Sequence, residues 1–153
     1  MTTLQQILLG TGLLAFSVII HVTVIALSIP YLAKIGAVLP KDRLPRLRYI
    51  VFFLLTIFIV VFAHTIEVWT WAAAFLLMTE LPNFSTSFYF ATVTYTTLGY
   101  GDIVLDAGAR IVATFCAVTG LLTFGISTAF LIGVLSRILP DIFADTDHDT
   151  QHD

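Results

Sequence analysis

The chain has 153 residues, of which 58% are hydrophobic and only 11% are charged, and its formal net charge is -3. A soluble globular domain has about 25% charged residues, so this chain has too little polar surface to cover one, and we expect a membrane protein. The negative charge argues against nucleic-acid binding, and the sequence shows no serine–histidine–aspartate set or metal-ligand spacing that would indicate an enzyme.

The first long apolar run extends from Ile7 to Ile29 and contains one ionisable residue, His21. Its 23 residues suffice to cross a hydrocarbon core about 30 Å thick, so residues 1–30 are predicted to form a transmembrane helix that Pro30 ends. The run lacks the positive region and cleavage pattern of a secretory signal, and we expect it to be retained. His21 is most simply a group buried between helices, and a polar contact with another subunit is the alternative.

A basic linker is predicted at residues 31–48. It holds five of the seven basic residues of the chain: Lys34, Lys41, Arg43, Arg46 and Arg48. The positive-inside bias places this linker in the cytoplasm and therefore places the N-terminus outside.

The second apolar run, Tyr49 to Met78, is longer than a perpendicular crossing requires, so it must tilt or protrude. Leu81-Pro82-Asn83 ends it. The next stretch, residues 84–97, is too short to span a bilayer and is predicted to be a re-entrant half-helix whose irregular end is buried in protein.

The third span is predicted from Ile111 to Leu135, a stretch without a single charge, and it is closed by Arg137 and Pro140. Residues 140–153 are an acidic segment too polar to pack a core, and we expect a disordered cytoplasmic tail. The predicted fold is therefore an all-α membrane protein with three transmembrane helices and one half-helix.

The sequence between the half-helix and the third span contains the run Thr-Thr-Leu-Gly-Tyr-Gly-Asp at residues 96–102, which we call the filter loop. Two glycines within three residues allow alternating backbone conformations that other residues disfavour. The carbonyl oxygens of such a loop can all turn toward one axis and replace the hydration shell of an ion.

The filter loop resembles that of the potassium-channel family, which reads Thr-Val-Gly-Tyr-Gly, and the resemblance covers roughly residues 84–137. It implies that K+ binds the Thr97 hydroxyl and the carbonyl groups of the loop. The implied ion-binding residues are Thr97, Leu98, Gly99, Tyr100 and Gly101. Leu98 departs from the common valine, but its side chain is expected to point away from the ions.

The resemblance also implies residues that support the filter loop. Thr96 precedes it, and Asp102 follows it, where many relatives hold a carboxylate with an aromatic residue of the pore helix; Tyr89 is the best candidate here. A solvated charge that concentrates cations at the outer mouth is the alternative role for Asp102.

One chain supplies one loop, so a closed ring of carbonyl groups implies a homotetramer. The pore domain is predicted at residues 49–139. The chain is similar to small prokaryotic channels with one additional N-terminal helix, which implies a plasma (inner) membrane. K+ is the expected ligand, no organic cofactor is expected, and the expected partners are other copies and lipid, without a soluble partner.

The third span carries small residues every four positions, Gly125, Ala129 and Gly133, a spacing that lets membrane helices approach closely. Gly120 lies where the family places a helix hinge, and close packing against the half-helix is the alternative. Three residues are candidates for the inner cavity or gate: Leu121, Phe124 and Thr128.

His64 and Glu67 lie three residues apart on one face of the second span, at a depth where ionisable groups are costly. We expect them to pair. The pair either steadies the scaffold behind the half-helix or senses pH.

Other functions remain as alternatives. Leu98 motivates a weakly selective cation channel. The chain could also be a non-conducting subunit that uses the pore fold, or a proton-coupled carrier using Glu67, although no internal repeat typical of carriers is found.

Overall fold

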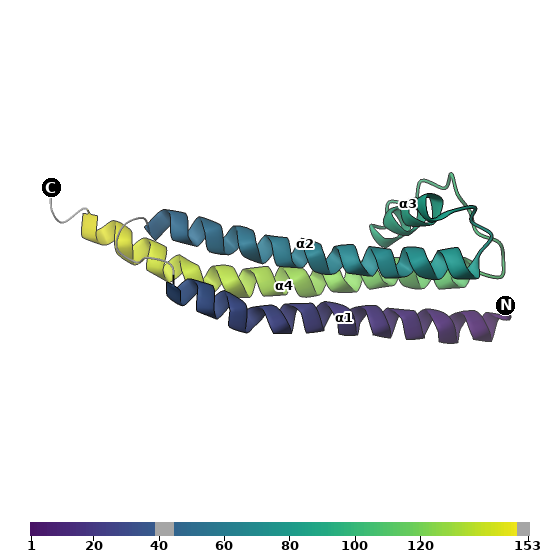
Figure 1. Ribbon diagram of the computed structural model, residues 1–153, viewed down its shortest axis with the longest axis horizontal. Helices are drawn as coiled ribbons and strands as arrows, with labels where there is room; N and C mark the ends of the chain where they lie inside the picture. Colours follow the sequence, from purple (N-terminus) through teal and green to yellow (C-terminus); the bar gives the residue numbers. More distant parts are fainter. Residues whose placement is uncertain (39–44, 150–153) are drawn as a thin grey trace.

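The computed structural model describes residues 1–38 and 45–149, and within these ranges all regular secondary structure is helical. The elements are α1 (Thr3–Val38), α2 (Pro45–Met78), α3 (Phe84–Tyr95) and α4 (Arg110–Asp149). The three long helices run side by side, and the short α3 packs against one end of the bundle (Figure 1). The predicted all-α fold with three spans and one short helix is confirmed.

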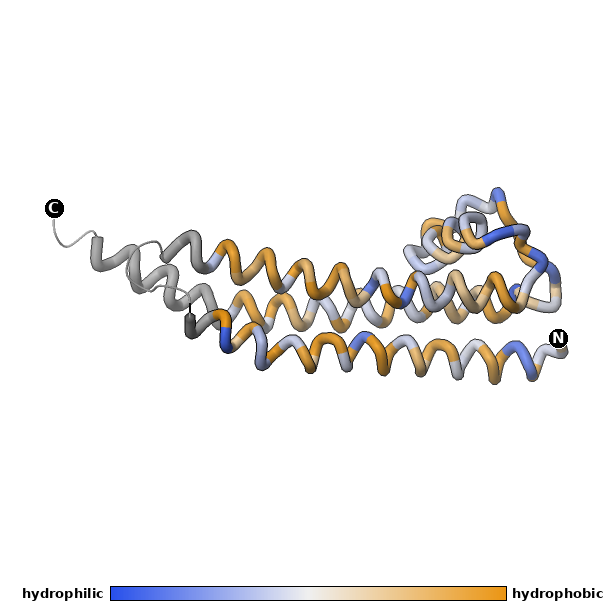
Figure 2. The backbone as a smooth tube through the Cα atoms, in the orientation of Figure 1, coloured by the Kyte–Doolittle hydropathy of each residue, from blue (hydrophilic) through white to orange (hydrophobic). Residues whose placement is uncertain are grey.

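The three long helices are apolar enough to cross a membrane. The candidate spans are Thr3–Ile35, Tyr49–Met78 and Arg110–Ser136. Each predicted span lies within one of these helices. In Figure 2 the long helices are hydrophobic over most of their length, and hydrophilic segments gather at the end of the bundle that carries α3.

The prediction that Pro30 ends the first span is wrong, because α1 continues through it to Val38. Proline at position 30 removes the backbone N–H that would bond the carbonyl of Ala26, and membrane helices tolerate such a loss when the surrounding helical pattern is kept. Figure 1 shows α1 bending in its C-terminal third, as expected around a proline.

The predicted disorder of the acidic segment is also wrong for residues 140–149, because α4 continues to Asp149. Five of the seven residues from 138 to 144 are apolar, so the helix-compatible pattern extends beyond Pro140. Residues 150–153 lie outside the described part of the chain. The same holds for residues 39–44 of the predicted basic linker, whereas residues 31–38 and 45–48 are helical.

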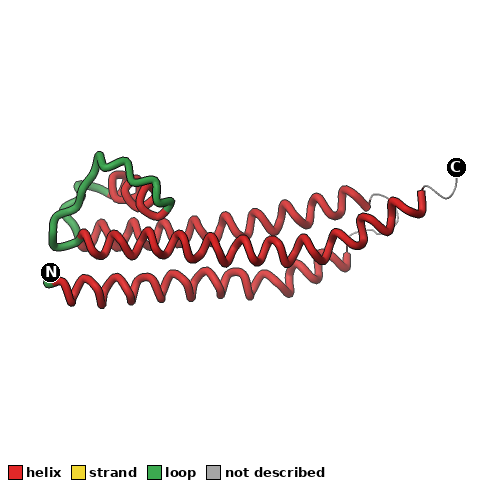
Figure 3. The backbone as a smooth tube through the Cα atoms, turned by 180° about the vertical axis from the view of Figure 1, so that it is seen from behind, coloured by secondary structure: helices red, strands yellow, loops and turns green. Residues whose placement is uncertain are grey.

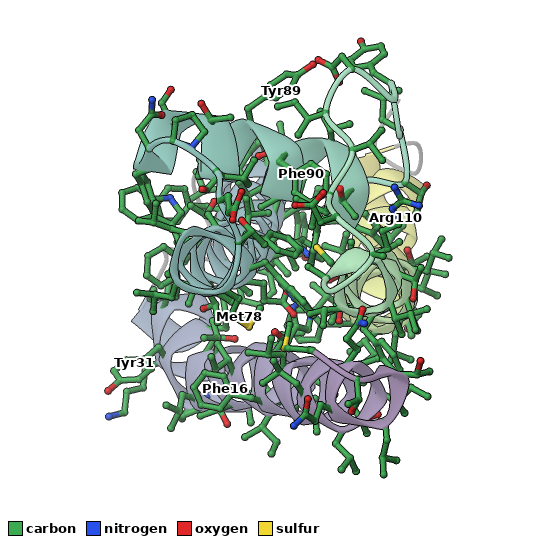
Figure 4. The ribbon with its side chains drawn as sticks, turned by 90° about the vertical axis from the view of Figure 1, so that its right-hand side faces the viewer. Phe16, Tyr31, Met78, Tyr89, Phe90 and Arg110 are labelled. Atoms are coloured by element: carbon green, nitrogen blue, oxygen red, sulfur yellow. The ribbon has the colours of Figure 1, made fainter. Side chains whose placement is uncertain are left out.

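The hydrophobic core lies where α3 packs onto α2 and α4. Its largest fully buried side chains include Trp71 and Phe75 of α2, with Phe90 of α3 edge-on to Phe75 at 5.0 Å between ring centroids. Cys116 of α4 is buried in this core, as expected for a small hydrophobic residue. Figure 4 looks onto this end of the molecule, with α3 above α2 and α4, and α1 below them.

The N-terminus of α1 is attached to the loop that leads into α4. Gln6 is 2% exposed, and its Nε2 donates to the carbonyl of Ala107 at 3.0 Å, while the backbone N–H of Ile111 donates to its Oε1 at 3.1 Å. The N-terminus and the filter loop therefore lie at the same end, as the predicted topology requires. Figure 3 shows that the long non-helical segments of the described chain are also at this end.

Candidate functional site

The filter loop starts directly at the C-terminal end of α3. Asn83 caps the other end of this 12-residue helix, its Oδ1 accepting a hydrogen bond from the backbone N–H of Thr86 at 2.9 Å. An aspartate or asparagine cap fixes where a helix begins. The partial negative charge of the α3 C-terminus is consequently presented at the start of the filter loop.

The backbone of the filter loop alternates in handedness. The φ angles of Thr97, Gly99 and Gly101 are 59°, 54° and 78°, whereas the residues between them have no positive φ. Only glycine adopts this region without cost, so two of the three positions carry the residue that they require. Alternation of this kind turns successive peptide groups toward the same side.

Backbone hydrogen bonds fix the direction in which the loop faces. The N–H groups of Leu98 and Gly99 both donate to the carbonyl of Val93 in α3, at 3.0 and 3.2 Å. The N–H and C=O of a trans peptide lie on opposite sides. The carbonyl groups of Thr97 and Leu98 therefore point away from α3, toward the open side of the chain.

Support for the loop comes from both sides of it. The Tyr89 hydroxyl donates to Asp102 Oδ2 at 2.7 Å, which is the contact expected from the sequence, and this hydrogen bond raises the pKa of Tyr89. Figure 4 shows Tyr89 beside the loop. The Thr96 hydroxyl donates back to the carbonyl of Thr92 at 2.8 Å, so its side chain closes the last turn of α3.

Gly120 lies against the C-terminal end of α3. A Cβ atom at this position would clash with the backbone carbonyl oxygen of Tyr95. This close approach favours the packing role over the hinge role for Gly120. Since Tyr95 is the last residue of α3, the contact sets where the filter loop begins relative to α4.

The other predicted residues of α4 face outward from the single chain. Leu121, Phe124 and Thr128 are all exposed, which is compatible with a cavity shared between copies. A Cβ atom added to Gly125 or Gly133 would meet no described atom within 4 Å. The close helix contact predicted for these small residues is therefore not made by the described part of one chain, and a contact between copies stays a prediction.

A buried polar cluster joins all four helices behind the filter loop. Glu67 of α2 is fully buried, and its Oε2 accepts hydrogen bonds from His21 Nδ1 at 2.9 Å and from the Tyr95 hydroxyl at 2.7 Å. His64 Nδ1 lies 3.4 Å from the same oxygen and 2.8 Å from the Tyr95 hydroxyl. The expected approach of His64 and Glu67 is present, but His21 is the nearer histidine.

Two hydroxyl groups of α4 complete the cluster. Ser127 Oγ lies 2.9 Å from His21 Nε2 and 3.0 Å from His64 Nε2, so it bridges the two rings. Thr123 Oγ1 lies 2.7 Å from the Tyr95 hydroxyl. Each helix therefore contributes at least one polar side chain to a single network.

The hydrogen-bond arrangement indicates how protons are distributed. An ionised Glu67 only accepts, so Tyr95 and His21 donate to it, and His64 then donates from Nδ1 to Tyr95. Ser127 has one hydrogen and can donate it to only one of the two Nε2 atoms. Ser127 therefore cannot donate to both histidines at once, and the tautomers of the two rings decide which Nε2 atom accepts its hydrogen.

Sequence reasoning missed four members of this cluster: His21 as a partner of Glu67, Tyr95, Thr123 and Ser127. His21 carried a usable signal, because an ionisable residue within an apolar span requires a polar partner on another helix. Tyr95, Thr123 and Ser127 carried none, since hydroxyl-bearing residues are common in membrane helices.

Comparison with known proteins identifies similar chains. Residues 48–137 match the family model described as "Ion channel". Potassium voltage-gated channel subfamily A member 7 of Mus musculus is 36% identical over 59 residues, which cover 38% of this chain and 12% of that protein. Subfamily A member 5 of Oryctolagus cuniculus is 31% identical over 74 residues, or 48% of this chain and 12% of that protein. No solved structure matches the chain significantly.

Proposed function

This chain belongs to the ion-channel family whose model matches residues 48–137, and we propose that it conducts K+ passively across a membrane through a ring of filter-loop carbonyl groups. Membership of this family indicates a channel rather than an enzyme. The similar proteins carry potassium-channel names, which supports K+ as the conducted ion, although the matched segment is only 12% of their length.

The observation that carries the proposal is the orientation of the filter-loop backbone. The carbonyl groups of Thr97 and Leu98 turn away from α3 because the N–H groups of Leu98 and Gly99 are held by Val93. Alternating positive φ angles continue this pattern to Gly101. Ion binding would then involve Thr97, Leu98, Gly99 and Tyr100, with Gly101 completing the loop.

The electrostatics of α3 favour a cation. Its C-terminal end carries the equivalent of about half a negative charge, directly before the filter loop. No basic side chain lies between Phe84 and Gly101, so no positive charge in this stretch opposes a cation.

A pore requires several copies of the loop, and a single chain supplies one. We propose a homotetramer with the filter loops around a common axis. Leu98 and Tyr100 are 55% and 68% exposed in the single chain, and neighbouring copies would cover them. The exposed face of α4 with Leu121, Phe124 and Thr128 would line the inner cavity.

We place the protein in a prokaryotic plasma membrane with its N-terminus outside. Asp102 and Tyr89 would then support the filter loop at the outer mouth. The scaffold role of His64 and Glu67 is favoured by their hydrogen bonds to Tyr95 and by the burial of Glu67.

Flux measurements on the purified full chain in liposomes test the proposal. A K+ gradient should drive a flux that barium blocks and that Na+ does not carry. Gly99→Ala should abolish it, because a Cβ is strained at a φ of 54°. Gly12→Ala is the matched control, since a Cβ at Gly12 meets no atom within 4 Å.

Two other outcomes separate the alternatives. Equal K+ and Na+ flux would indicate a weakly selective cation channel, for which the replacement of valine by Leu98 is the motivating feature. Absence of any flux from correctly inserted tetramers would indicate a non-conducting subunit and would refute the proposal.

A further inference from the structure

Three side chains of the buried polar cluster form a set of metal ligands. The ligand atoms of His21, His64 and Glu67 all lie within 4.8 Å of one another. Two imidazole nitrogens and one carboxylate oxygen suit divalent transition metals, and zinc above the hard cations. We propose that these residues bind one divalent transition-metal ion, represented by Zn2+, between α1 and α2.

Two of the three ligand distances approach those of a metal site. Zinc lies about 2.0–2.2 Å from nitrogen and oxygen ligands, so tetrahedral ligand atoms are roughly 3.4 Å apart. Here His21 Nδ1 and His64 Nδ1 lie 2.9 and 3.4 Å from Glu67 Oε2. The third distance, between the two histidines, is at most 4.8 Å, so binding would draw the two imidazole rings toward one another.

Ser127 orients both histidines for this role. Its Oγ lies within hydrogen-bond distance of both Nε2 atoms. A hydroxyl oxygen has two lone pairs and can accept both Nε2–H groups, which leaves both Nδ1 atoms unprotonated toward the metal. Metal-binding histidines usually donate their other ring N–H to a fixed acceptor of this kind.

A second feature of the cluster points to a missing ligand. Glu67 Oε1 is buried and has no hydrogen-bond partner among the described residues. A buried carboxylate oxygen without a partner is unfavourable, and a metal ion bound by both carboxylate oxygens of Glu67 would supply one. The partial negative charge at the C-terminus of α3, which ends at Tyr95, also favours a cation here.

Binding would replace existing interactions. His64 is 14% exposed, whereas His21 and Glu67 are fully buried, so a metal ion would approach from the His64 side. It would displace the hydrogen bonds of the Tyr95 hydroxyl to His64 and Glu67. Tyr95 is thus a competitor of the metal rather than a required ligand.

The test measures Zn2+ binding to the purified full chain by equilibrium dialysis and metal analysis, with excess Mg2+ to occupy sites built only from oxygen ligands. The background variant is His148→Gln/His152→Gln, which removes the other two histidines of the chain. It should bind one Zn2+ per chain, and Co2+ in its place should show the absorption bands of a tetrahedral site with nitrogen ligands.

Substitutions in this background distinguish ligands from their neighbours. His21→Gln and Glu67→Gln should lose binding, and Ser127→Ala should weaken it by about 10- to 100-fold. Tyr95→Phe should bind at least as tightly as the background. Helix content and monodispersity are checked for each variant. If a ligand variant fails to fold, the Zn2+ affinity of Ser127→Ala tests the metal site in its place.

The proposal is overturned if the background variant binds no Zn2+, or if binding is unchanged in His21→Gln, Glu67→Gln or Ser127→Ala. These results do not depend on ion flux. A chain that conducts K+ but binds no Zn2+ would refute the metal site and leave the channel proposal intact.

Discussion

The hydroxyl group of Tyr95 lies 2.7 Å from Glu67 Oε2 and so joins the last residue of α3 to the middle of α2. It also lies 2.8 Å from His64 Nδ1 and 2.7 Å from Thr123 Oγ1. Because this one group has three neighbours on two spans, its removal should affect both the stability of the fold and the position of α3.

We expect Tyr95→Phe to lower the free energy of unfolding by about 1–3 kcal/mol, since it leaves buried polar groups with fewer partners. Thermal unfolding in detergent measures the effect. Tyr31→Phe is the control, because Tyr31 is 65% exposed on α1 and its hydroxyl should contribute little. Equal stability of the two variants would contradict a stabilising role for the cluster.

Gly120→Ala should destabilise the protein by about 1–3 kcal/mol, because the added methyl group meets the Tyr95 carbonyl oxygen. The same variant should reduce K+ flux, since α3 must move to relieve the clash. The control is Gly12→Ala in α1, where a Cβ meets no atom within 4 Å, and its unfolding temperature should stay close to that of the parent. If Gly120 acted as a hinge and not through packing, Gly120→Ala would change the K+ flux and leave the free energy of unfolding unchanged.

Gln6→Ala should lower stability by about 1–3 kcal/mol, because it removes both side-chain hydrogen bonds between α1 and the loop before α4. Gln5→Ala serves as the control. Gln5 is exposed, and in the described part of the chain its Oε1 accepts a hydrogen bond from the backbone N–H of Thr2, its neighbour at the start of the chain. If the two variants unfold at the same temperature, the attachment of the N-terminus is not stabilising.

Tyr89→Phe should destabilise the filter loop modestly, because it removes the hydrogen bond to Asp102 from a side chain that is 39% exposed. Asp102→Asn should have a similar effect, and the double variant should lose less than the sum of the two single losses. The free energies of unfolding of the parent, the two single variants and the double variant give the coupling free energy between Tyr89 and Asp102. If the two single losses add up to the loss in the double variant, the two side chains do not interact.

The pH dependence of this pair has a definite sign. Hydrogen bonding to Asp102 raises the pKa of Tyr89 in the folded state. The contribution to stability is therefore complete below the unfolded pKa of about 10 and disappears as pH rises through the folded value. The difference between the parent and Tyr89→Phe should persist at neutral pH and disappear in strongly alkaline solution.

The architecture could be predicted because a bilayer imposes a length on every span. The apolar runs that begin at Ile7, Tyr49 and Ile111 were long enough to cross, and the filter loop was recognisable because glycines at fixed positions permit an unusual backbone. The expected contact of Tyr89 with Asp102 was also found, and that expectation came from the resemblance to the potassium-channel family.

Other features depended on contacts that local patterns do not contain. Pro30 and Pro140 were expected to end helices, yet both helices continue, because a missing N–H can be tolerated when the surrounding pattern remains helical. The sequence paired Glu67 with His64, its neighbour on the same helix. The shorter contact with His21 arises from packing between α1 and α2, 46 residues apart in the chain.

The position of Tyr95 has a consequence for the loop that follows it. Its carbonyl oxygen abuts Gly120 of α4, and its hydroxyl is held by α2, which is itself bonded to α1 through His21. A displacement of any one of these three helices would therefore act on Tyr95 and, through it, on the filter loop that begins at the next residue.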